Sequence, residues 1–442
     1  MKLLDWFRPG IHIKRWLLVA VFGIACISFG LSFMVREIYM SLLERLLSVF
    51  LILSGFIFII ISARYVVGTF FHAITNSGFR MSLDSDRLSS LLFEKRILIK
   101  GPKIVAIGGG TGLSTMLRGL KAYSSNLTAV VTVADDGGGS GMLRQDLGML
   151  PPGDIRNCVL ALADTEPIME QLLQYRFQDG MLKGQNFGNL FLAAMDGISN
   201  SFEEAVRKMS DVLAVTGRVL PVTLEDVRLC AELEDGFVIN GESKIGKHNS
   251  FHDGKIKKIS LEPKSVRPLQ EVLDAIAEAD AVILGPGSLY TSIIPNLLAD
   301  GICDALKNSN AIKLYVCNVM TQPGETDGYS VYDHVSALEE HSCKGILDYC
   351  IANDAGIPGE LEIRYREDGA ETVPIDDDKL EAAGIKLLQG DYVQIRNGFV
   401  RHDPEKLAET IIDLVAENIL VKDKKRIIDY YYVKDRLRKS GR

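Results

Sequence analysis

The chain is 442 residues long with a formal net charge of −8, and 47% of its residues are hydrophobic, enough for a sizeable core. This length suits two or three domains, and the acidic balance argues against a general nucleic-acid-binding protein, which is usually basic. The seven cysteines form no Cys-x-x-Cys pair, so we expect reduced thiols in an intracellular compartment rather than a disulfide framework.

Two uncharged apolar stretches near the N-terminus have the length of transmembrane helices. They cover residues 16–35 and 46–63, and each is close to the length that crosses roughly 30 Å of hydrocarbon. Basic residues precede the first stretch and follow the second, so the positive-inside rule places both ends in the cytoplasm. We therefore predict a two-helix transmembrane anchor over residues 1–68. A cleaved signal peptide is the main alternative for the first stretch, but a second span follows it at once.

A connector is expected over residues 69–100, and the main domain over 101–421. In this domain strand-like apolar runs alternate with helical patterns. The predicted strands cover residues 103–107, 127–133, 281–284 and 312–317. Such alternation indicates βαβ units, and therefore an α/β fold with a mostly parallel sheet. A polar or glycine-rich segment follows each of these strands, directly in three cases and after Ala134 in the case of strand 127–133. The carboxyl edge of a parallel sheet is where ligands bind.

The first of these segments is a glycine turn, Gly108-Gly109-Gly110-Thr111-Gly112. Glycine allows positive φ and a close approach of the backbone to a ligand. The free N–H groups at the start of the following helix favour an anion, so we expect a phosphate, most simply that of a nucleotide. The turn lacks the sixth-position glycine of the dinucleotide fingerprint and the Gly-Lys-Ser/Thr ending of a P-loop. A tight strand-to-helix turn without a ligand is the alternative.

The second strand ends in Asp135 and Asp136, followed by Gly137-Gly138-Gly139-Ser140-Gly141. An acidic residue at this place can accept hydrogen bonds from a ribose. Two adjacent carboxylates beside a phosphate site can also hold a hydrated Mg²⁺. An acidic turn without a ligand is the alternative reading.

Two further helix starts carry polar residues. Asp154 opens one apolar helix, where we expect it to act as the N-cap. Arg156 in the same first turn is unfavourable for the helix dipole, and an anionic ligand would offset that. Asn189 lies at the start of another apolar helix, where ligand contact and simple capping are equally good explanations.

Residues 213–261 carry short alternating runs joined by Glu234-Asp235-Gly236, which predicts a small antiparallel addition. Farther along, the segment 285–288, Gly-Pro-Gly-Ser, is a second candidate phosphate cradle, with Thr291 and Ser292 one turn on. Asn318 and Thr321 are candidates to contact a base or a sugar. The tail, 422–442, has nine Lys/Arg and three Asp, so it is either a solvated tail or a contact with anionic lipid.

Taken together, these segments resemble the YvcK family of bacterial gluconeogenesis factors. The family belongs to one superfamily with CofD, the 2-phospho-L-lactate transferase of deazaflavin cofactor biosynthesis. The matching motifs, in the family's order, are residues 109–112, 133–138, 150–157, 187–191, 218–221, 284–292 and 317–324. The resemblance runs from about residue 103 to 418. The membrane hairpin lies outside the usual core and resembles a longer, anchored form.

The resemblance implies a Rossmann-like fold, with helices on both faces of the sheet, that binds a UDP-sugar such as UDP-N-acetylglucosamine. It also implies a role in cell shape and wall synthesis on gluconeogenic carbon sources. In the transferase branch a metal assists the transfer. Many relatives carry a histidine where this chain has Gln185, and Gln185 cannot replace a histidine as general acid or base. Relatives also usually have Ser at the position of Gly139.

Our first hypothesis is a membrane-tethered regulatory protein that binds a nucleotide sugar and acts through cell-wall synthesis proteins. The alternative is a Mg²⁺-dependent transferase acting on a nucleotide-activated donor. An NAD-dependent oxidoreductase is the weakest hypothesis. No catalytic residue is assigned, Mg²⁺ is the one candidate cofactor, and self-association is left open. The candidate nucleotide contacts are Gly109, Gly110, Thr111, Gly112, Asp135, Asp136, Gly138, Arg156, Asn157, Asn189, Gly285, Gly287, Ser288, Asn318 and Thr321, with Asp135 and Asp136 also as metal ligands.

Overall fold

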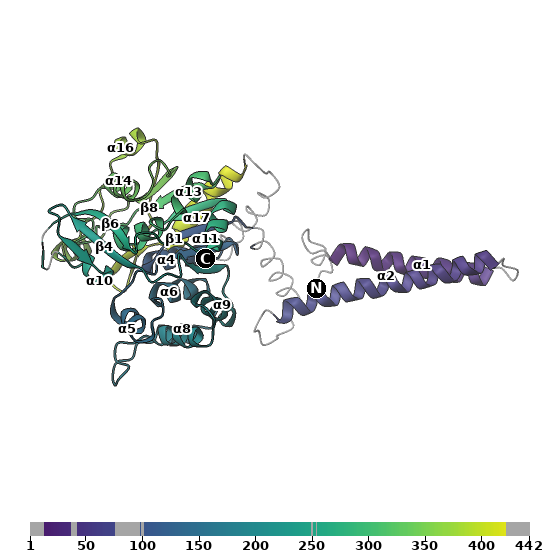
Figure 1. The fold of residues 1–442 in the computed structure, drawn as a ribbon. Coiled ribbons are helices and arrows are strands. Elements are labelled where there is room, and N and C mark those ends of the chain that lie inside the picture. The colour runs from purple at the N-terminus through teal and green to yellow at the C-terminus, as the bar shows by residue number, and fades with distance from the viewer. Residues whose placement is uncertain are drawn as a thin grey trace. The chain divides into compact units, whose positions relative to one another are not determined.

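The computed structural model of the protein describes residues 13–36, 42–75, 98, 101–248, 251–252 and 254–420 (Figure 1). The chain forms two compact units, Met1–Ile97 and Leu98–Arg442. Most of the expected connector and the whole basic tail lie outside the described residues. Helix α2 continues to Thr75, past the expected end of the anchor at residue 68.

The first unit is a pair of antiparallel helices, α1 (Ile13–Arg36) and α2 (Leu42–Thr75). Glycines let their backbones approach closely, because a Cβ on Gly55 would lie 2.6 Å from the carbonyl oxygen of Gly23. At the other end of the pair, the rings of Trp16 and Tyr65 stack with centroids 4.1 Å apart. The Ser62 hydroxyl donates a hydrogen bond to the Trp16 carbonyl oxygen at 2.7 Å.

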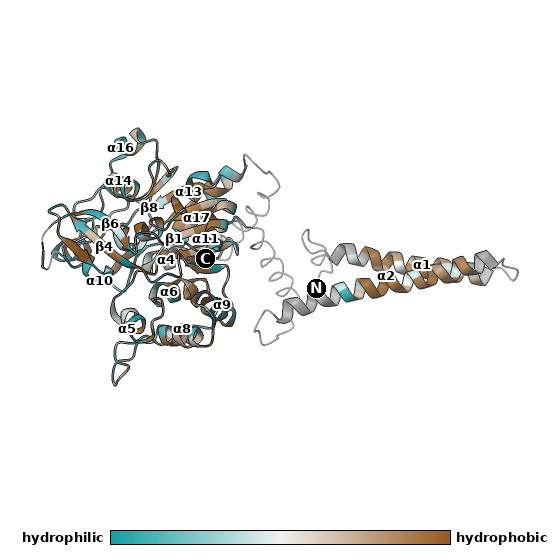
Figure 2. Ribbon diagram, in the orientation of Figure 1, coloured by the Kyte–Doolittle hydropathy of each residue, from teal (hydrophilic) through white to brown (hydrophobic). Residues whose placement is uncertain are grey.

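Most of the described length of both helices is coloured as hydrophobic in Figure 2. Phe22, Phe29 and Phe50 are each more than half exposed. Among the described helices, one apolar segment, Leu46–Tyr65, is long enough to cross a membrane, whereas the apolar part of α1 is the shorter Leu18–Ser32. The structure therefore shows one of the two expected spans, by length and composition.

The core of the second unit is a seven-stranded parallel sheet in the order β10-β9-β8-β7-β1-β2-β3. Its strands are β1 (Ile104–Gly108), β2 (Leu127–Val131), β3 (Arg218–Pro221), β7 (Ala281–Leu284), β8 (Ile312–Val316), β9 (Tyr349–Asn353) and β10 (Lys386–Gly390). Every residue of β1, β2 and β7 is buried, as expected for strands covered on both faces. The α/β fold predicted from the alternation is confirmed.

The chain reverses its direction of winding beside β1. From β1 it runs outward through β2 and β3, then returns to β7 on the other side of β1 and runs outward to β10. In register, Ile104 pairs with both Leu127 and Ala281. In an open parallel sheet, the crevice outside the carboxyl ends at such a switch point is the usual ligand site.

Helices flank the sheet. They are α4 (Gly110–Leu120), α5 (Gly138–Leu147), α6 (Gly153–Leu162), α7 (Pro167–Gln174), α8 (Phe187–Gly197), α9 (Phe202–Val212), α10 (Glu242–Ile245), α11 (Gln270–Glu278), the π-helical turn η3 (Leu289–Ile293), α12 (Ile294–Leu297), α13 (Ile302–Asn308), α14 (Val331–His341), α15 (Gly359–Glu367), α16 (Asp377–Ala382) and α17 (Pro404–Leu420). Helix α17 packs so closely on α4 that a Cβ on Gly119 would overlap the carbonyl group of Pro404.

A three-stranded antiparallel sheet is inserted between β3 and β7, as the sequence predicts. Its order is β5 (Val238–Asn240), β4 (Arg228–Leu233), β6 (Ile256–Glu262). Asp235 shapes the β4–β5 turn, because its Oδ1 accepts a hydrogen bond from the Phe237 N–H at 2.9 Å. A two-stranded sheet of β11 (Val393–Arg396) and β12 (Phe399–His402) was not predicted.

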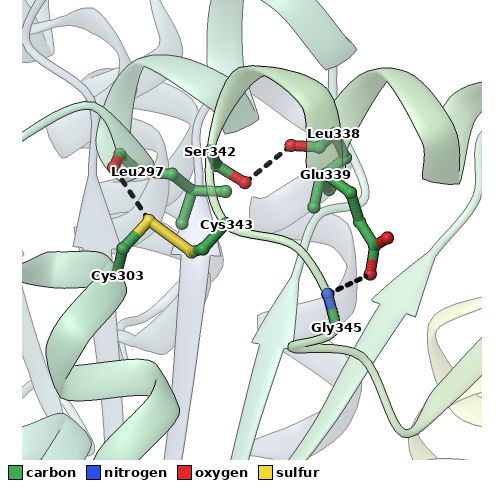
Figure 3. The surroundings of a disulfide bond; sticks show 7 residues. All are labelled: Leu297, Cys303, Leu338, Glu339, Ser342, Cys343 and Gly345. Carbon is green, nitrogen blue, oxygen red and sulfur yellow. Dashed lines mark hydrogen bonds between the residues drawn. A yellow bond between two sulfur atoms is a disulfide. The ribbon is translucent and has the colours of Figure 1, made fainter.

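One expectation about the cysteines is wrong. Cys303 of α13 and Cys343, just after α14, form a disulfide with their Cα atoms 5.8 Å apart (Figure 3). Five cysteines in the described residues remain free. The two partners are 40 residues apart, and only the packing of α13 beside the end of α14 brings them together, so their spacing carries no signal in the sequence.

Candidate functional site

The glycine turn after β1 presents a helix N-terminus at the switch point. Gly110 has φ +69°, a conformation that favours glycine, and it starts α4. The N-cap residue Gly109 has no side chain to bond the free N–H groups, and the first turn of α4 has no acidic residue. The N–H groups of this turn are therefore well placed for an anion.

The segment after β7 lies against the glycine turn. A Cβ on Gly112 would lie 2.6 Å from the Pro286 carbonyl oxygen, and one on Gly287 would lie 3.1 Å from the Gly109 carbonyl oxygen. The two loops thus touch through backbone atoms. The structure brings together the two phosphate cradles that the sequence predicts, although about 175 residues separate them along the chain.

These loops form one wall of a cleft. Its lining is Gly109, Gly110, Thr111, Gly112, Thr132, Asp135, Asp154, Glu242, Gly287, Ser288, Thr291 and Ser292. Seven of the fifteen predicted contacts are among them: the first four, Asp135, Gly287 and Ser288. The cleft thus combines backbone N–H groups and hydroxyl groups with three carboxyl groups, which we call the acidic wall.

Asp154 is one of the half-buried carboxyl groups of this lining. It lies in the first turn of α6, whose N-cap is Pro152, so the expected N-cap role is wrong. Its carboxylate instead accepts a hydrogen bond from the Gly110 N–H. Burial, and next the charge of Asp135, raise the pKa of Asp154 to about 6. The same carboxylate explains why Gly109 has no side chain, since a Cβ there would lie 2.5 Å from Asp154 Oδ2.

Two further carboxyl groups complete the acidic wall. Asp135 Oδ1 accepts a hydrogen bond from the Gly137 N–H at 2.8 Å, yet burial raises the pKa of Asp135. Glu242 starts α10 in the antiparallel insertion. Burial, followed by the charges of Asp135 and Glu325, raises the pKa of Glu242 to about 8. The wall therefore holds an excess of negative charge that burial makes unfavourable.

Asp136 does not share this cleft with Asp135. Its Oδ1 accepts a hydrogen bond from the Ser243 N–H at 2.8 Å, so it fixes the start of α10 and, with it, Glu242. The two residues expected as adjacent metal ligands therefore have different hydrogen-bond partners: Asp135 accepts from Gly137 and Asp136 accepts from Ser243. Within the residues that the structure describes, no group of three or more His, Cys, Asp or Glu side chains is arranged to hold a metal ion.

Behind the second cradle lies a hydrogen-bonded network. Ser288 Oγ donates to Gln322 Oε1 at 2.7 Å, and Gln322 Nε2 donates to Glu325 Oε1 at 2.8 Å. Burial raises the pKa of Glu325 to about 7. Asn318 Nδ2 donates to the Gly287 carbonyl oxygen at 2.8 Å, so Asn318 holds the cradle from outside rather than lining the cleft.

Other predicted contacts lie away from the cleft lining. Thr321 is buried, and its Oγ1 accepts a hydrogen bond from the Glu371 N–H at 2.8 Å. Gly138 begins α5 with φ +49°. Arg156 is buried, and its Nη1 and Nη2 donate to Asn189 Oδ1 at 3.0 Å and Asn157 Oδ1 at 2.6 Å. Burial lowers the pKa of Arg156 to about 10.

Sequence reasoning did not select Glu242, Thr132 or Glu325. Glu242 reaches the cleft from the inserted sheet, and no local pattern marks that approach. Thr132 directly follows β2 (Leu127–Val131), at the same edge as Asp135, but the predicted strand, 127–133, included it, so the sequence offered no reason to select it. Glu325 belongs to the polar segment after β8, but its burial comes from contacts with Thr291 and Gln322 that the sequence does not show.

Comparisons with known proteins match both the domain and the whole chain. The family model for 2-phospho-L-lactate transferase CofD matches residues 104–393. A relative from Clostridium acetobutylicum is 53% identical over 441 residues, covering 100% of this chain and 98% of that protein. The gluconeogenesis factor of Bacillus subtilis is 48% identical over 317 residues, covering 72% of this chain and 99% of that protein. A crystal structure of a protein from Bacillus halodurans, 47% identical, superposes with a TM-score of 0.67 over 70% of this chain and 98% of that chain.

Proposed function

The chain belongs to the CofD family as a homologue of the gluconeogenesis factors, and on that basis we propose that it is a regulatory protein. It binds a nucleotide sugar in the cleft lined by the loops that follow β1 and β7. The ligand would be a UDP-sugar such as UDP-N-acetylglucosamine. The protein would relate the level of this metabolite to cell shape and wall synthesis through partner proteins of the wall machinery.

The observation that carries this proposal is the contact of two glycine loops at the switch point of the sheet. Together they offer the N–H groups of the first turn of α4, apart from the Gly110 N–H that Asp154 accepts, and the hydroxyl groups of Thr291 and Ser292 to one small space. A diphosphate is the part of a nucleotide sugar that such a site suits. The cleft volume is about 270 Å³, slightly below the 300–1,000 Å³ usual for drug-sized ligands, so the base and the sugar would extend beyond it.

The acidic wall fits a Mg²⁺ ion that accompanies the diphosphate. Mg²⁺ takes hard oxygen ligands, and it is usually held by one or two carboxylates together with phosphate oxygens and water. Asp135 and Asp154 line the cleft and would supply those carboxylates. The ion would neutralise charge on both the wall and the phosphates. A larger cluster of protein ligands is not required for this arrangement.

The second candidate function is a transferase of the 2-phospho-L-lactate type, and one observation favours it. Asp154, with its pKa raised to about 6, is a half-buried carboxyl group beside the phosphate cradle and is able to exchange a proton near neutral pH. Against it stands Gln185, a buried amide at the place where many relatives carry a histidine. An amide does not exchange protons in this pH range, so we favour binding over turnover.

We also propose that the helix pair anchors the protein through two membrane spans within residues 16–63, with the second unit in the cytoplasm. The long apolar segment Leu46–Tyr65 supports the second span. For the first span, the support is its close packing on α2 at Gly23 and Gly55 and its apolar outer surface. Small residues at the contact and apolar residues outside are typical of helix pairs in lipid.

Titration calorimetry of the full chain in detergent micelles tests the binding proposal. UDP-N-acetylglucosamine is added with and without Mg²⁺, and the recovered ligand is identified by mass spectrometry. Saturable binding, stronger with Mg²⁺ and with the ligand returned intact, is the expected result. A cleaved ligand would overturn the regulatory function in favour of the transferase. Absence of binding under both conditions would overturn the nucleotide-sugar proposal itself.

A further inference from the structure

Arg156 is a buried guanidinium group without an acidic partner. It is 9% exposed, and its two Nη atoms donate only to the neutral amide oxygens of Asn189 and Asn157. Its Nε has no hydrogen-bond partner. Among the described residues no carboxylate lies within ion-pair distance of it. Arg144, which is also little exposed, forms an ion pair with Asp226 instead.

A second arginine near Arg156 adds to the excess of positive charge in this part of the domain. Arg176 is close enough to lower the pKa of Arg156 further, so two positive charges share this part of the domain. In the described part of the chain, Arg176 also forms no ion pair, and its Nη1 donates to the Gly184 carbonyl oxygen. The charge of Asp154 acts on Arg156 in the opposite direction and raises its pKa, but Asp154 forms no ion pair with Arg156, is hydrogen-bonded to the Gly110 N–H and lines the cleft. A buried cation without an ion-pair partner is costly, and an anion from outside the chain would supply one.

The surrounding backbone also suits an anion. A Cβ on Gly188 would lie 2.6 Å from Arg156 Cδ, so the first turn of α8 packs directly on the stem of the arginine. That turn has no acidic residue, although Asn186 Oδ1 caps it by accepting a hydrogen bond from the Asn189 N–H at 3.3 Å, and the first turn of α5 has neither an acidic residue nor a side-chain cap. Gln185 connects these two helix starts, because a Cβ on Gly139 of α5 would lie 3.0 Å from Gln185 Oε1.

We propose that Arg156, held by Asn157 and Asn189, receives an anionic group, a phosphate or a carboxylate, at the start of α8. Arg156 is not among the residues that line the cleft at the glycine turn. The proposal deepens the proposed function, because the anion is either a second charged group of the nucleotide ligand or a separate small molecule bound beside it. In both cases the shared chemistry is a planar or tetrahedral oxyanion facing a guanidinium group and a helix N-terminus.

Inorganic phosphate is the probe for a first experiment on the full chain in detergent micelles. The thermal midpoint is measured against phosphate at constant ionic strength for the wild type, Arg156→Met and Arg118→Met. Methionine keeps an apolar stem against Gly188. Arg118 is the control because it has an acidic partner, Glu170, at 2.8 Å.

Phosphate should raise the midpoint of the wild type and of Arg118→Met by equal amounts, and that of Arg156→Met by clearly less, because only the cleft at the glycine turn then remains to bind it. Without phosphate, Arg156→Met should be at least as stable as the wild type, because no unpaired charge remains to be buried. Two results would overturn the proposal. One is an unchanged phosphate response in Arg156→Met. The other is a marked loss of stability of that variant without phosphate, which would show a structural role.

A second experiment separates the two sources of the anion. If one ligand carries both charged groups, phosphate competes with UDP-N-acetylglucosamine, and Arg156→Met weakens that ligand by about tenfold or more. If the anion is a separate molecule, the variant retains its affinity for the nucleotide sugar, and phosphate still raises the midpoint of the wild type when the nucleotide sugar is saturating. If the nucleotide sugar fails to bind while the phosphate response still depends on Arg156, the proposed function fails and the Arg156 site stands.

Discussion

Replacing Asp154 by Asn should stabilise the protein while impairing its site. The pKa of Asp154 is about 6 in the folded state, against 3.8 for the free side chain. The folded state therefore favours the protonated form, and ionisation destabilises it. Stability falls as pH rises from about 4 to about 6, then levels off. A shift of about two pKa units corresponds to about 3 kcal/mol at pH 8, of which about half is already present at pH 5.

Asn keeps an oxygen acceptor for the Gly110 N–H and has no charge to ionise. Thermal unfolding of Asp154→Asn and the wild type at pH 5 and pH 8 measures the difference. The gain should approach about 3 kcal/mol at pH 8 and fall to about half at pH 5. Asp164→Asn, an exposed position just after α6, is the control and should show neither effect. A variant no more stable than the wild type at pH 8, or a gain independent of pH, would refute the burial argument.

Three further changes test other parts of the structure. Gly112→Ala should weaken nucleotide-sugar binding in calorimetry by tenfold or more, about 1.4 kcal/mol, because its Cβ would push against the Pro286 carbonyl oxygen. The control Gly197→Ala, whose Cβ meets nothing within 4 Å, should bind normally. Equal affinities of the two variants would place the ligand elsewhere. Gly55→Leu should separate α1 from α2 and shift the fluorescence of Trp16, because Trp16 then loses its stacking on Tyr65. The control Ile57→Leu, at an exposed position, should leave the fluorescence unchanged. An unchanged spectrum of Gly55→Leu would contradict the close packing of the helices. Cys303→Ser should lower the free energy of unfolding by about 4 kcal/mol, from closure of a loop of about 40 residues. Reducing agent should abolish the difference in stability between Cys303→Ser and the wild type. The control Cys230→Ser, which removes a free thiol, should not lower the free energy of unfolding in this way. Equal stability of Cys303→Ser and the wild type without reductant would argue against the disulfide.

The sequence predicted the fold better than it predicted the site. Strands buried on both faces have continuous apolar runs, so β1 and β7 were expected correctly, and the glycine segments that follow them lie against each other at one edge of the sheet. The insertion between β3 and β7 was expected from its alternating runs. The small sheet of β11 and β12 was missed.

The site depended on contacts that no local pattern reports. Glu242 enters from the inserted sheet, and its approach is fixed by the hydrogen bond between Asp136 and the start of α10. Asp154 has the sequence of a helix cap, but it bonds to the glycine turn instead. Adjacent carboxylates suggested a metal pair, yet Asp135 and Asp136 have different partners because successive side chains in a loop point in different directions.

The pairing of β1 with β7 has a consequence for biosynthesis. Ile104 pairs with Ala281, so 177 residues must be added before the central strand acquires its second neighbour. At the typical ~5–20 residues per second of translation, this takes about 10–35 s. Through that interval, one edge of a fully apolar strand and the glycine turn beside it lack their native cover, which is the condition for wrong strand pairing. We therefore expect the growing chain to need a chaperone most before the segment 285–288 has packed against the glycine turn.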